Sequence, residues 1–433
     1  MHRKKEAEDY IYASYLKAEK HLKFNDKDEV KRHPEYTKDI LRKLSKVPMI
    51  TITGSKGKGS VAYMVSEILQ TKLNVGLMTS PHISDFCERF RFNGKLISDK
   101  DFFNCVEEIK PQFDEIENTL RSSEYISPIG LQAAVALTYF NDKHTDINVI
   151  EHGKGAKYDD VTNITHQYAA INTIFLEHTR ELGKTLEEIA ADKVHTITDD
   201  VKVVATAEQK PEVTDIIRKR ANDKKCKLLE YGKDFWAENI KFSKSGMLFD
   251  AVTTKNKYIG LKIPLLGIHQ AKNCALAIAL CEYILPYIDT FKLKGCLLRL
   301  NWPGRQEIIS SDPFIMLDAS INRVNAESVK ETLKNMDFSK VATIIGIPDD
   351  KDFLGVAEVM ADISGKIILT RSSNPHYIFT EKQIDKLEQK GIKAIYTNSL
   401  SEALNLARAY HLPTVILGTT SLISDVKNIK LSS

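Results

Sequence analysis

The sequence has no apolar run that approaches the roughly 18 residues of a membrane-spanning helix. Its six cysteines include no C-x-x-C pair, which argues against a disulfide framework and favours reduced thiols in the cytosol. No long block of Lys or Arg occurs and the formal net charge is only +3, so nucleic-acid binding has no support. The N-terminal residues lack the apolar core of a signal peptide. These absences predict a cytoplasmic protein with no membrane or nucleic-acid partner.

A glycine-rich turn lies between a strand-like run and an amphipathic helix in residues 47–69. Residues 49–53 are β-prone, and apolar side chains recur at helical spacing from Val61 onward. Glycines bring backbone N–H groups close to a ligand and the helix dipole adds positive charge, so this arrangement suits phosphate. Lys58 can reach the outer phosphates, and the Ser60 hydroxyl can ligate Mg²⁺.

The spacing of this loop is tighter than the usual G-x-x-x-x-G-K-[ST] pattern, although its parts are the same. A glycine turn that binds no nucleotide is the alternative. The flanking strand and helix favour the first interpretation. We predict that a nucleoside triphosphate such as ATP binds at Gly54, Ser55, Lys56, Gly57, Lys58, Gly59 and Ser60.

Helix and strand patterns alternate along the 433 residues, a length that exceeds one ordinary domain. The stretch Trp302-Pro303-Gly304 interrupts the pattern, and four strand candidates separated by helical stretches follow it. Such alternation is typical of a mostly parallel sheet. We predict an α/β protein of two domains. Residues 1–299 form an N-terminal helical segment and a P-loop ATP-binding domain, and residues 300–433 form a smaller Rossmann-like domain.

Polar side chains follow three of the predicted strands in the first domain. Ligands sit beyond the carboxyl ends of the strands in open α/β sheets, and serine and carboxylate oxygens suit Mg²⁺. Taken alone, a histidine such as His178 is more often structural than a ligand, but the sheet edge that it shares with Glu151 and Lys58 favours a place in the site. The strands at 74–80, 147–152 and 169–176 are thus predicted to end in Ser80, Glu151 and His178.

Several segments agree in order and spacing with one known family. They are ITITGSKGKGS, LMTSPHISDFCERFRFNGKLIS, IEHGKGAKYDDVTNI, LEHTRELGKTLEEIAADK, GIHQAKNCALAIA, WPGRQEII, DDKDF and ILTRSSNPH. Over residues 47–430 the chain resembles the folylpolyglutamate synthase and dihydrofolate synthase branch of the Mur ligase superfamily. The second of these segments is the most distinctive.

The resemblance implies roles for several residues of the first domain. Lys58 would hold the β- and γ-phosphates of ATP. Ser80 and Glu151 would ligate one Mg²⁺ ion, and His178 would help to hold a second. Lys193 would correspond to a lysine that reacts with CO₂ to form a carbamate and then supports a metal. The alternative for Lys193 is an ordinary surface lysine.

The resemblance also implies three further contacts with the nucleotide. Asn273 would contact adenine, and Asp318 would contact the ribose. Arg305 would bind the phosphates across a cleft between the domains, because a guanidinium group donates two parallel hydrogen bonds. The catalytic candidates are therefore Lys58, His178, Lys193 and Arg305.

The implied reaction joins a carboxylate to an amino acid. A carboxylate is a poor electrophile, so transfer of the γ-phosphoryl group of ATP would first make an acyl phosphate, with Mg²⁺ and Lys58 neutralising the charge. An amine, such as that of glutamate, would then displace phosphate. The expected substrates are a small-molecule carboxylate acceptor, which in the family is folate, and an amino acid. The expected protein is a monomer.

The chain departs from the family pattern D-G-A-H-N-P at residues 318–323. Ile321 occupies the position of the family's histidine, and Arg323 occupies that of its proline. Either Arg323 supplies the lost polar contact, or the acceptor has changed so that the contact is not needed. We predict that Arg323 takes part in activity and also that folates are poor acceptors; a solvated surface arginine is the alternative. Two other functions stay open. One is an ATP-binding relative without ligase activity that acts as a partner or regulator, and the other is an ATPase or kinase.

Overall fold

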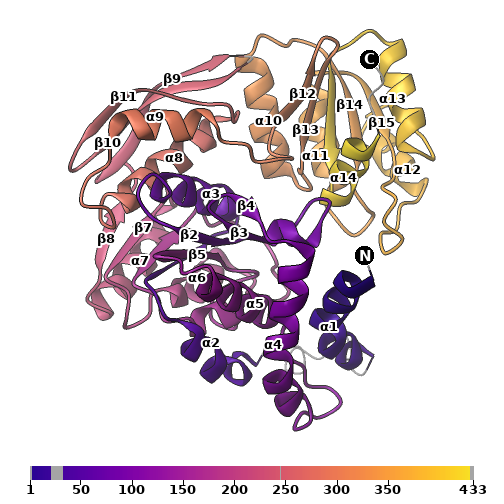
Figure 1. Cartoon of the computed structure of the whole chain (residues 1–433). Coiled ribbons are helices and arrows are strands. Elements are labelled where there is room, and N and C mark those ends of the chain that lie inside the picture. The colour runs from indigo at the N-terminus through magenta and orange to yellow at the C-terminus, as the bar shows by residue number, and fades with distance from the viewer. Residues whose placement is uncertain (1, 21–32, 244, 430–433) are drawn as a thin grey trace. The chain divides into compact units, whose positions relative to one another are not determined.

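The computed structural model of the chain describes residues 2–20, 33–243 and 245–429 (Figure 1). The chain divides into two compact units, each of which is described by itself. The predicted boundary between residues 299 and 300 stays a prediction. The first unit comprises Met1–Glu238, Ala251–Ile259 and Lys272–Leu297, and the second comprises Asn239–Asp250, Gly260–Ala271 and Leu298–Ser433.

The first unit contains an eight-stranded sheet in the order β4-β3-β2-β5-β1-β6-β7-β8. Strand β1 (Met49–Thr53) lies between β5 (Ile147–Glu151) and β6 (Tyr168–Ile171) and is parallel to both. All five residues of β1 are buried, as expected for a strand with both faces covered. The other strands are β2 (Val75–Met78), β3 (Phe90–Phe92), β4 (Lys95–Leu96), β7 (Val203–Thr206) and β8 (Lys227–Glu230), and only β3 and β4 run antiparallel to their neighbours.

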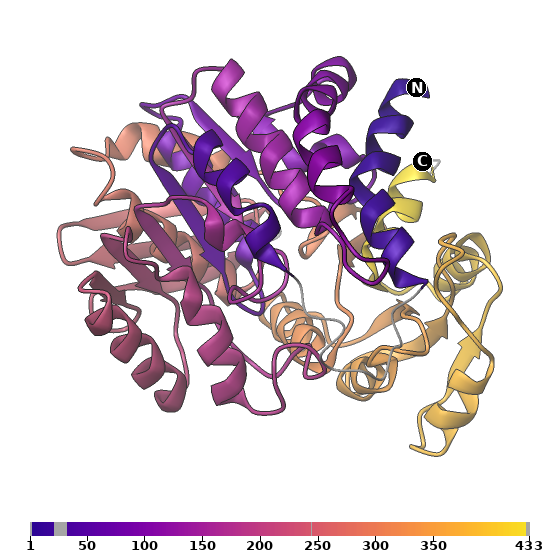
Figure 2. The same ribbon diagram turned by 90° about the horizontal axis from the view of Figure 1, so that it is seen from below.

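Helices α1 (His2–Glu19), α4 (Asp99–Glu117) and α5 (Pro128–Asp142) pack side by side (Figure 2) and share an apolar cluster with the sheet. Helices α6 (Leu186–Lys193) and α7 (Pro211–Asp223) share a second cluster with β6 and β7. A capping box starts α6, because the side chains of Thr185 and Glu188 satisfy each other's backbone N–H groups. The remaining helices before residue 300 are α2 (Lys38–Leu44), α3 (Lys58–Leu69), α8 (Ile268–Cys281) and α9 (Thr290–Leu298).

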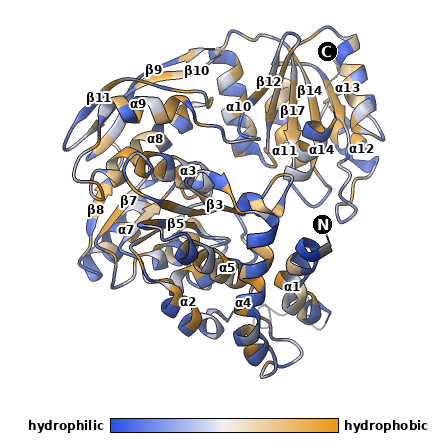
Figure 3. Cartoon of the chain, viewed as in Figure 1, coloured by the Kyte–Doolittle hydropathy of each residue, from blue (hydrophilic) through white to orange (hydrophobic). Residues whose placement is uncertain are grey.

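The second unit contains a six-stranded sheet in the order β12-β13-β17-β14-β15-β16, in which only β12 is antiparallel to its neighbour. Its inner strands are coloured mostly hydrophobic, whereas its helices carry both hydrophilic and hydrophobic residues (Figure 3). The strands are β12 (Glu307–Ser311), β13 (Phe314–Asp318), β14 (Val341–Gly346), β15 (Ser364–Leu369), β16 (Ala394–Tyr396) and β17 (Thr414–Gly418). The helices are α10 (Arg323–Asn335), α11 (Phe353–Ala361), α12 (Lys382–Glu388), α13 (Leu400–Ala409) and α14 (Thr420–Asn428). A separate three-stranded sheet has the order β11-β10-β9, with β9 at Phe235–Ser243, β10 at Gly246–Thr253 and β11 at Lys257–Ile263.

The predicted α/β class with mostly parallel sheets is confirmed. The strand predicted at residues 169–176 is too long, because β6 ends at Ile171 and the chain then turns toward the glycine loop. The stretch FNDKDEVKRHP, residues 24–34, predicts a break in the charged helical pattern of residues 5–45, and it lies almost entirely outside the described residues. No helix in the described part of the chain is both long and apolar enough to cross a membrane.

Candidate functional site

The glycine-rich loop, residues 54–60, connects β1 to α3 in a conformation that requires glycine at two positions. Gly54 has φ of +138° and Gly57, the N-cap of α3, has φ of +77°. A Cβ atom at Gly57 would lie 2.4 Å from Nδ2 of Asn172. A side chain at Gly57 would therefore be strained by its backbone angle and would also collide with a neighbour. The predicted strand, turn and helix are all present.

The segment that follows β6 holds this loop in place. The Ser55 N–H donates to the carbonyl oxygen of Thr173 at 3.0 Å. The Ser55 hydroxyl donates to the carbonyl oxygen of Phe175 at 3.1 Å. The Phe175 N–H lies 3.1 Å from the same hydroxyl oxygen and donates to it. These three bonds tie the start of the loop to the segment that follows β6. Lys56 and Lys58 remain partly exposed beside it, whereas Ser60 is buried in the first turn of α3.

Asn273 lies beside the loop, as a nucleotide contact requires. Its Oδ1 accepts a hydrogen bond of 2.9 Å from Nδ2 of Asn172, and its Nδ2 is 3.2 Å from the position of a Cβ at Gly57. Sequence reasoning missed Asn172. The signal was the same as for Glu151, because Asn172 directly follows a strand that neighbours β1, but the predicted strand ran past it.

Two lysines meet at the start of the loop. Lys58 Nζ donates to the Gly54 carbonyl oxygen at 3.2 Å, and Lys193 Nζ donates to the same oxygen at 3.0 Å. Lys193 also pairs with Glu177 at 2.9 Å, and only 1% of its side chain is exposed. Burial lowers the pKa of Lys193, and the charge of Lys58 lowers it further, whereas Glu177 opposes the shift. The surface-lysine alternative is therefore wrong.

Glu151 and Ser80 are neighbours at the carboxyl ends of the strands β5 and β2. Glu151 ends β5 and is buried, and its Oε2 accepts a hydrogen bond of 2.8 Å from the Ser80 N–H. The parallel pairing of β2 with β5 brings the two residues together. A buried carboxylate beside a hydroxyl is a hard-oxygen donor set, so the residues present fit a Mg²⁺ ion.

The predicted role of His178 at a second metal ion stays a prediction. His178 lies seven residues beyond the end of β6, has φ of +44°, and its Nε2 is 3.8 Å from Glu177 Oε2. Partial burial lowers the pKa of His178, and the charge of Lys154 lowers it further, so both favour the neutral imidazole. Among the described residues, the one group of three His, Cys, Asp or Glu ligand atoms within 4.8 Å of one another is Asp85, Cys87 and Asp99. Lys4 already pairs with both carboxylates of that group, at 2.6 and 2.9 Å.

Arg305 and Asp318 belong to the second unit, at the end of the antiparallel β12–β13 pair where β12 begins and β13 ends. Asp318, at the end of β13, accepts the Gln306 N–H at 2.9 Å and also the hydroxyl of Ser320. Arg305 Nη1 donates to the Gly304 carbonyl oxygen at 3.1 Å. The carboxylate of Asp318 thus fixes the backbone directly after Arg305. Their predicted contacts with the nucleotide stay predictions.

Arg323, the predicted substitute for the family's histidine, has another partner. Its guanidinium group pairs with Glu358 on α11, and 47% of its side chain is exposed. Ile321 is half-buried one residue before Asn322, whose side chain caps α10. The structure therefore favours the alternative of a surface arginine.

Residues 52–281, which are more than half of the chain, match the family described as the Mur ligase middle domain. The chain belongs to the Mur ligase family. The glycine loop, Glu151, Lys193 and Asn273 all lie within the matched region.

Similar proteins carry the names that the motifs implied. The Bacillus subtilis dihydrofolate synthase/folylpolyglutamate synthase is 28% identical over 80% of this chain and 81% of its own length. A "probable bifunctional folylpolyglutamate synthase/dihydropteroate synthase" of Haloferax volcanii is 28% identical over 88% of this chain, which spans only 46% of that relative. The solved Mycobacterium tuberculosis folylpolyglutamate synthase complexed with ADP and AMPPCP has a TM-score of 0.86 at 24% identity, covering 98% and 99% of the two chains. The resemblance to this branch of the Mur ligases is confirmed.

Proposed function

We propose that this Mur ligase family member is an ATP-dependent ligase that joins a carboxylate to an amino acid through an acyl phosphate. One observation carries the proposal: a phosphate-type glycine loop has two lysines, Lys58 and Lys193, on one of its carbonyl groups. Glu151, at the end of β5, and Asn273, on α8, lie in the same unit. The names of the relatives support this assignment.

The loop suits the first half-reaction, in which the acceptor carboxylate takes the γ-phosphoryl group of ATP. Backbone N–H groups at the start of α3 would face the phosphates, and the helix dipole favours negative charge there. The Lys58 ammonium group is partly exposed and can leave the Gly54 carbonyl for a phosphate oxygen. Ser80 and Glu151 would hold Mg²⁺, which when bound supplies positive charge to the phosphate oxygens.

The environment of Lys193 suits a reaction with CO₂. Carbamate formation joins the amine nitrogen to the carbon of CO₂ and releases one proton, so it requires a neutral amine. Burial and the charge of Lys58 both favour that neutral form. The carbamate would place an anionic group beside the loop. His178 and Arg305 are proposed as further participants, with Asp318 at the ribose.

Folate and glutamate are the proposed substrates, because the similar proteins are folylpolyglutamate or dihydrofolate synthases. In the second half-reaction the amine of the amino acid attacks the acyl carbon, phosphate leaves, and an amide bond forms. Ile321 in place of the family's histidine leaves a second acceptor class open. A monomeric, cytoplasmic enzyme stays a prediction.

The test is to assay the purified chain with ATP, a carboxylate acceptor and an amino acid, each supplied and withheld in turn. Folates and glutamate form the first pair. A ligase releases ADP only when both substrates are present and yields a product with the mass of acceptor plus amino acid minus water. Phosphate left on the acceptor would instead indicate a kinase, and ATP binding without turnover with any pair would indicate a binding protein.

A further inference from the structure

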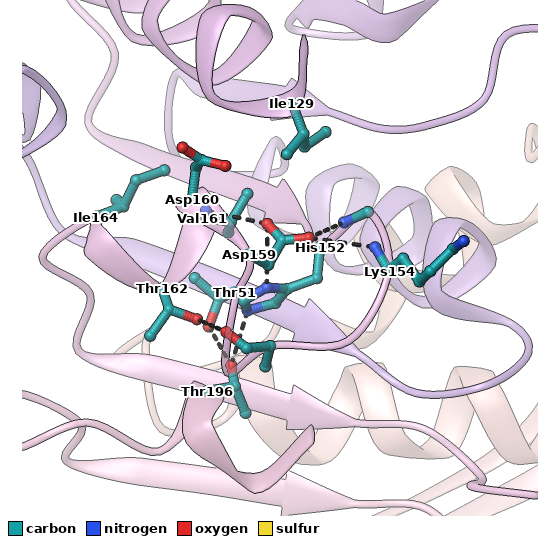
Figure 4. Close-up of polar contacts among 12 residues, drawn as sticks. Thr51, Ile129, His152, Lys154, Asp159, Asp160, Val161, Thr162, Ile164 and Thr196 are labelled. Carbon is teal, nitrogen blue, oxygen red and sulfur yellow. Dashed lines mark hydrogen bonds and ion pairs between the residues drawn. The ribbon is translucent and has the colours of Figure 1, made fainter. Parts of the chain in front are cut away.

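Two hydroxyl groups and one imidazole form a buried hydrogen-bond network inside the first unit (Figure 4). Oγ1 of Thr51 lies 2.8 Å from Oγ1 of Thr196, which lies 3.1 Å from Nε2 of His152. All three residues are 0% exposed. A substrate therefore cannot reach these atoms, so they do not act in the chemistry directly.

Each member of this network is close in sequence to a residue of the proposed site. Thr51 lies on β1, three residues before Gly54, and Thr196 lies three residues after Lys193. His152 directly follows Glu151. Two hydrogen bonds therefore join the segment of residues 51–54 to that of residues 193–196. One is the Thr51–Thr196 bond, and the other is the bond of 3.0 Å from Lys193 to Gly54.

The surroundings of His152 favour one tautomer. Its Nδ1 has no hydrogen-bond partner among the described residues, but Oδ1 of Asp159 lies 3.7 Å away. That carboxylate is fixed by N–H groups of Gly153 and Val161, each at 3.0 Å, and it favours a proton on Nδ1. We assign this tautomer from the contacts, since hydrogens are not observed. Nε2 then accepts a hydrogen bond.

With this tautomer, both hydroxyl protons of the Thr51–Thr196–His152 network donate to a partner. Thr51 donates to Thr196, and Thr196 donates to His152 Nε2. Buried hydrogen bonds of this kind are directional, and removal of one partner leaves the other unsatisfied away from water. The Thr51–Thr196–His152 network therefore fixes the distances between β1, the carboxyl end of β5 and the segment that follows α6.

The two bonds of Lys193 cannot both persist through the proposed reaction. Carbamate formation would leave a nitrogen with a single N–H beside an anionic carboxylate, so the ion pair with Glu177 would be lost and at most one hydrogen bond, to Gly54, could remain. The Thr51–Thr196–His152 network is not altered by that step. We propose that Thr51, Thr196 and His152 are positioning residues, which keep Lys193 and Glu151 in register with the glycine loop after the ion pair of Lys193 with Glu177 is lost. This inference rests on the proposed function.

The decisive variant is Thr196→Val, which removes the hydroxyl and keeps the shape. We expect backbone amide hydrogen exchange in residues 54–60 and 186–196 to become at least about threefold faster. We expect kcat for ADP release to fall at least about tenfold, with the Kd for a non-hydrolysable ATP analogue changed less than about threefold. Thr196→Ser, which restores the hydroxyl, should recover both the exchange and kcat.

Thr198→Val is the matched control, because Thr198 Oγ1 is buried yet has no hydrogen-bond partner among the described residues. It should leave exchange and kcat as in the wild type. Thr51→Val breaks only the Thr51–Thr196 bond, whereas Thr196→Val also breaks the bond to His152, so Thr51→Val should change exchange and kcat in the same direction but by less. The double variant should be no worse than Thr196→Val, because Thr196→Val already breaks both bonds. If Thr196→Val does not fold, Thr51→Val tests the same bond from the other side.

Unchanged exchange in both valine variants would overturn the inference, and so would faster exchange without a fall in kcat. An equal fall in kcat for Thr198→Val would also overturn it. The wild-type assay separately decides the proposed function. If the wild type releases no ADP with any substrate pair, the ligase assignment and the positioning role built on it both fail, while faster exchange in Thr196→Val would still show a structural bond.

Discussion

Lys58 and Lys193 donate to a single acceptor, the carbonyl oxygen of Gly54, at 3.2 and 3.0 Å. Two ammonium groups this close repel each other, and Glu177 compensates only the Lys193 side. Because burial and the charge of Lys58 favour the neutral amine of Lys193, the positive charge that attracts a polyphosphate to the start of the glycine loop rests on Lys58. The two lysines are not equivalent, because Lys58 is partly exposed and Lys193 is buried.

Lys58→Ala should abolish ADP release and leave the fold intact. The side chain makes one hydrogen bond to the Gly54 carbonyl and lies outside the apolar core, so its loss should cost at most about 1 kcal/mol of stability. Turnover and thermal unfolding should be measured on the same preparation. Near-normal ADP release from a folded variant would remove the phosphate role from this lysine.

Lys193→Ala should also be nearly inactive, but small carboxylates should restore part of its activity. Acetate or formate could occupy the space and supply the anionic group that the carbamate would provide. Wild-type chain incubated with ¹³C-bicarbonate should show a carbamate signal that the variant lacks. A fully active Lys193→Ala enzyme would contradict this role.

Glu151→Gln should weaken activity mainly through metal binding. The amide oxygen of glutamine can still accept the Ser80 N–H, so local structure should survive while one anionic ligand is lost. The Mg²⁺ concentration for half-maximal rate should rise severalfold, roughly five or more. A Mg²⁺ titration identical to that of the wild type would exclude Glu151 as a ligand.

Gly57→Ala should weaken nucleotide binding more than its backbone angle alone explains. A positive φ costs alanine about 1 kcal/mol, and at Gly57 the added methyl group would also displace Asn172. Gly232→Ala is the control, since Gly232 has φ of +83° and nothing lies within 4 Å of its Cβ position. Titration calorimetry with ADP should show weaker binding only for Gly57→Ala. Equal affinities for the two variants would contradict the close approach of Asn172.

Arg323→Ala should change kcat/KM by less than about threefold, because the guanidinium group is half-exposed and paired with Glu358. Steady-state kinetics with the best acceptor provide the measurement. A tenfold loss would restore the expectation from sequence that Arg323 replaces the family's histidine.

The sequence predicted the parts of the site that local pattern determines. The glycine loop, with its strand and helix, follows from composition within about 20 residues, and the end of β5 at Glu151 follows from the carboxyl-edge rule. Contacts between distant segments could not be predicted in this way. The approach of Asn172 to Gly57 and the burial of Lys193 depend on how β6 and α6 pack beside β1, which no local pattern encodes. Edge strands β12 and β16 were missed for a similar reason, since their residues are only partly buried and lack a strong apolar run.

The division of the chain into two units has a practical consequence for expressing its halves. The chain passes from one unit to the other after residues 238, 250, 259, 271 and 297. No single cut therefore separates them. A fragment that stops at residue 297 would keep 239–250 and 260–271 without the unit to which they belong, leaving residues such as Met247, Phe249 and Leu261, buried in the whole chain, without their full packing. Such a fragment is expected to aggregate, and co-expression of two complementary pieces would be the more promising route to a split form of the protein.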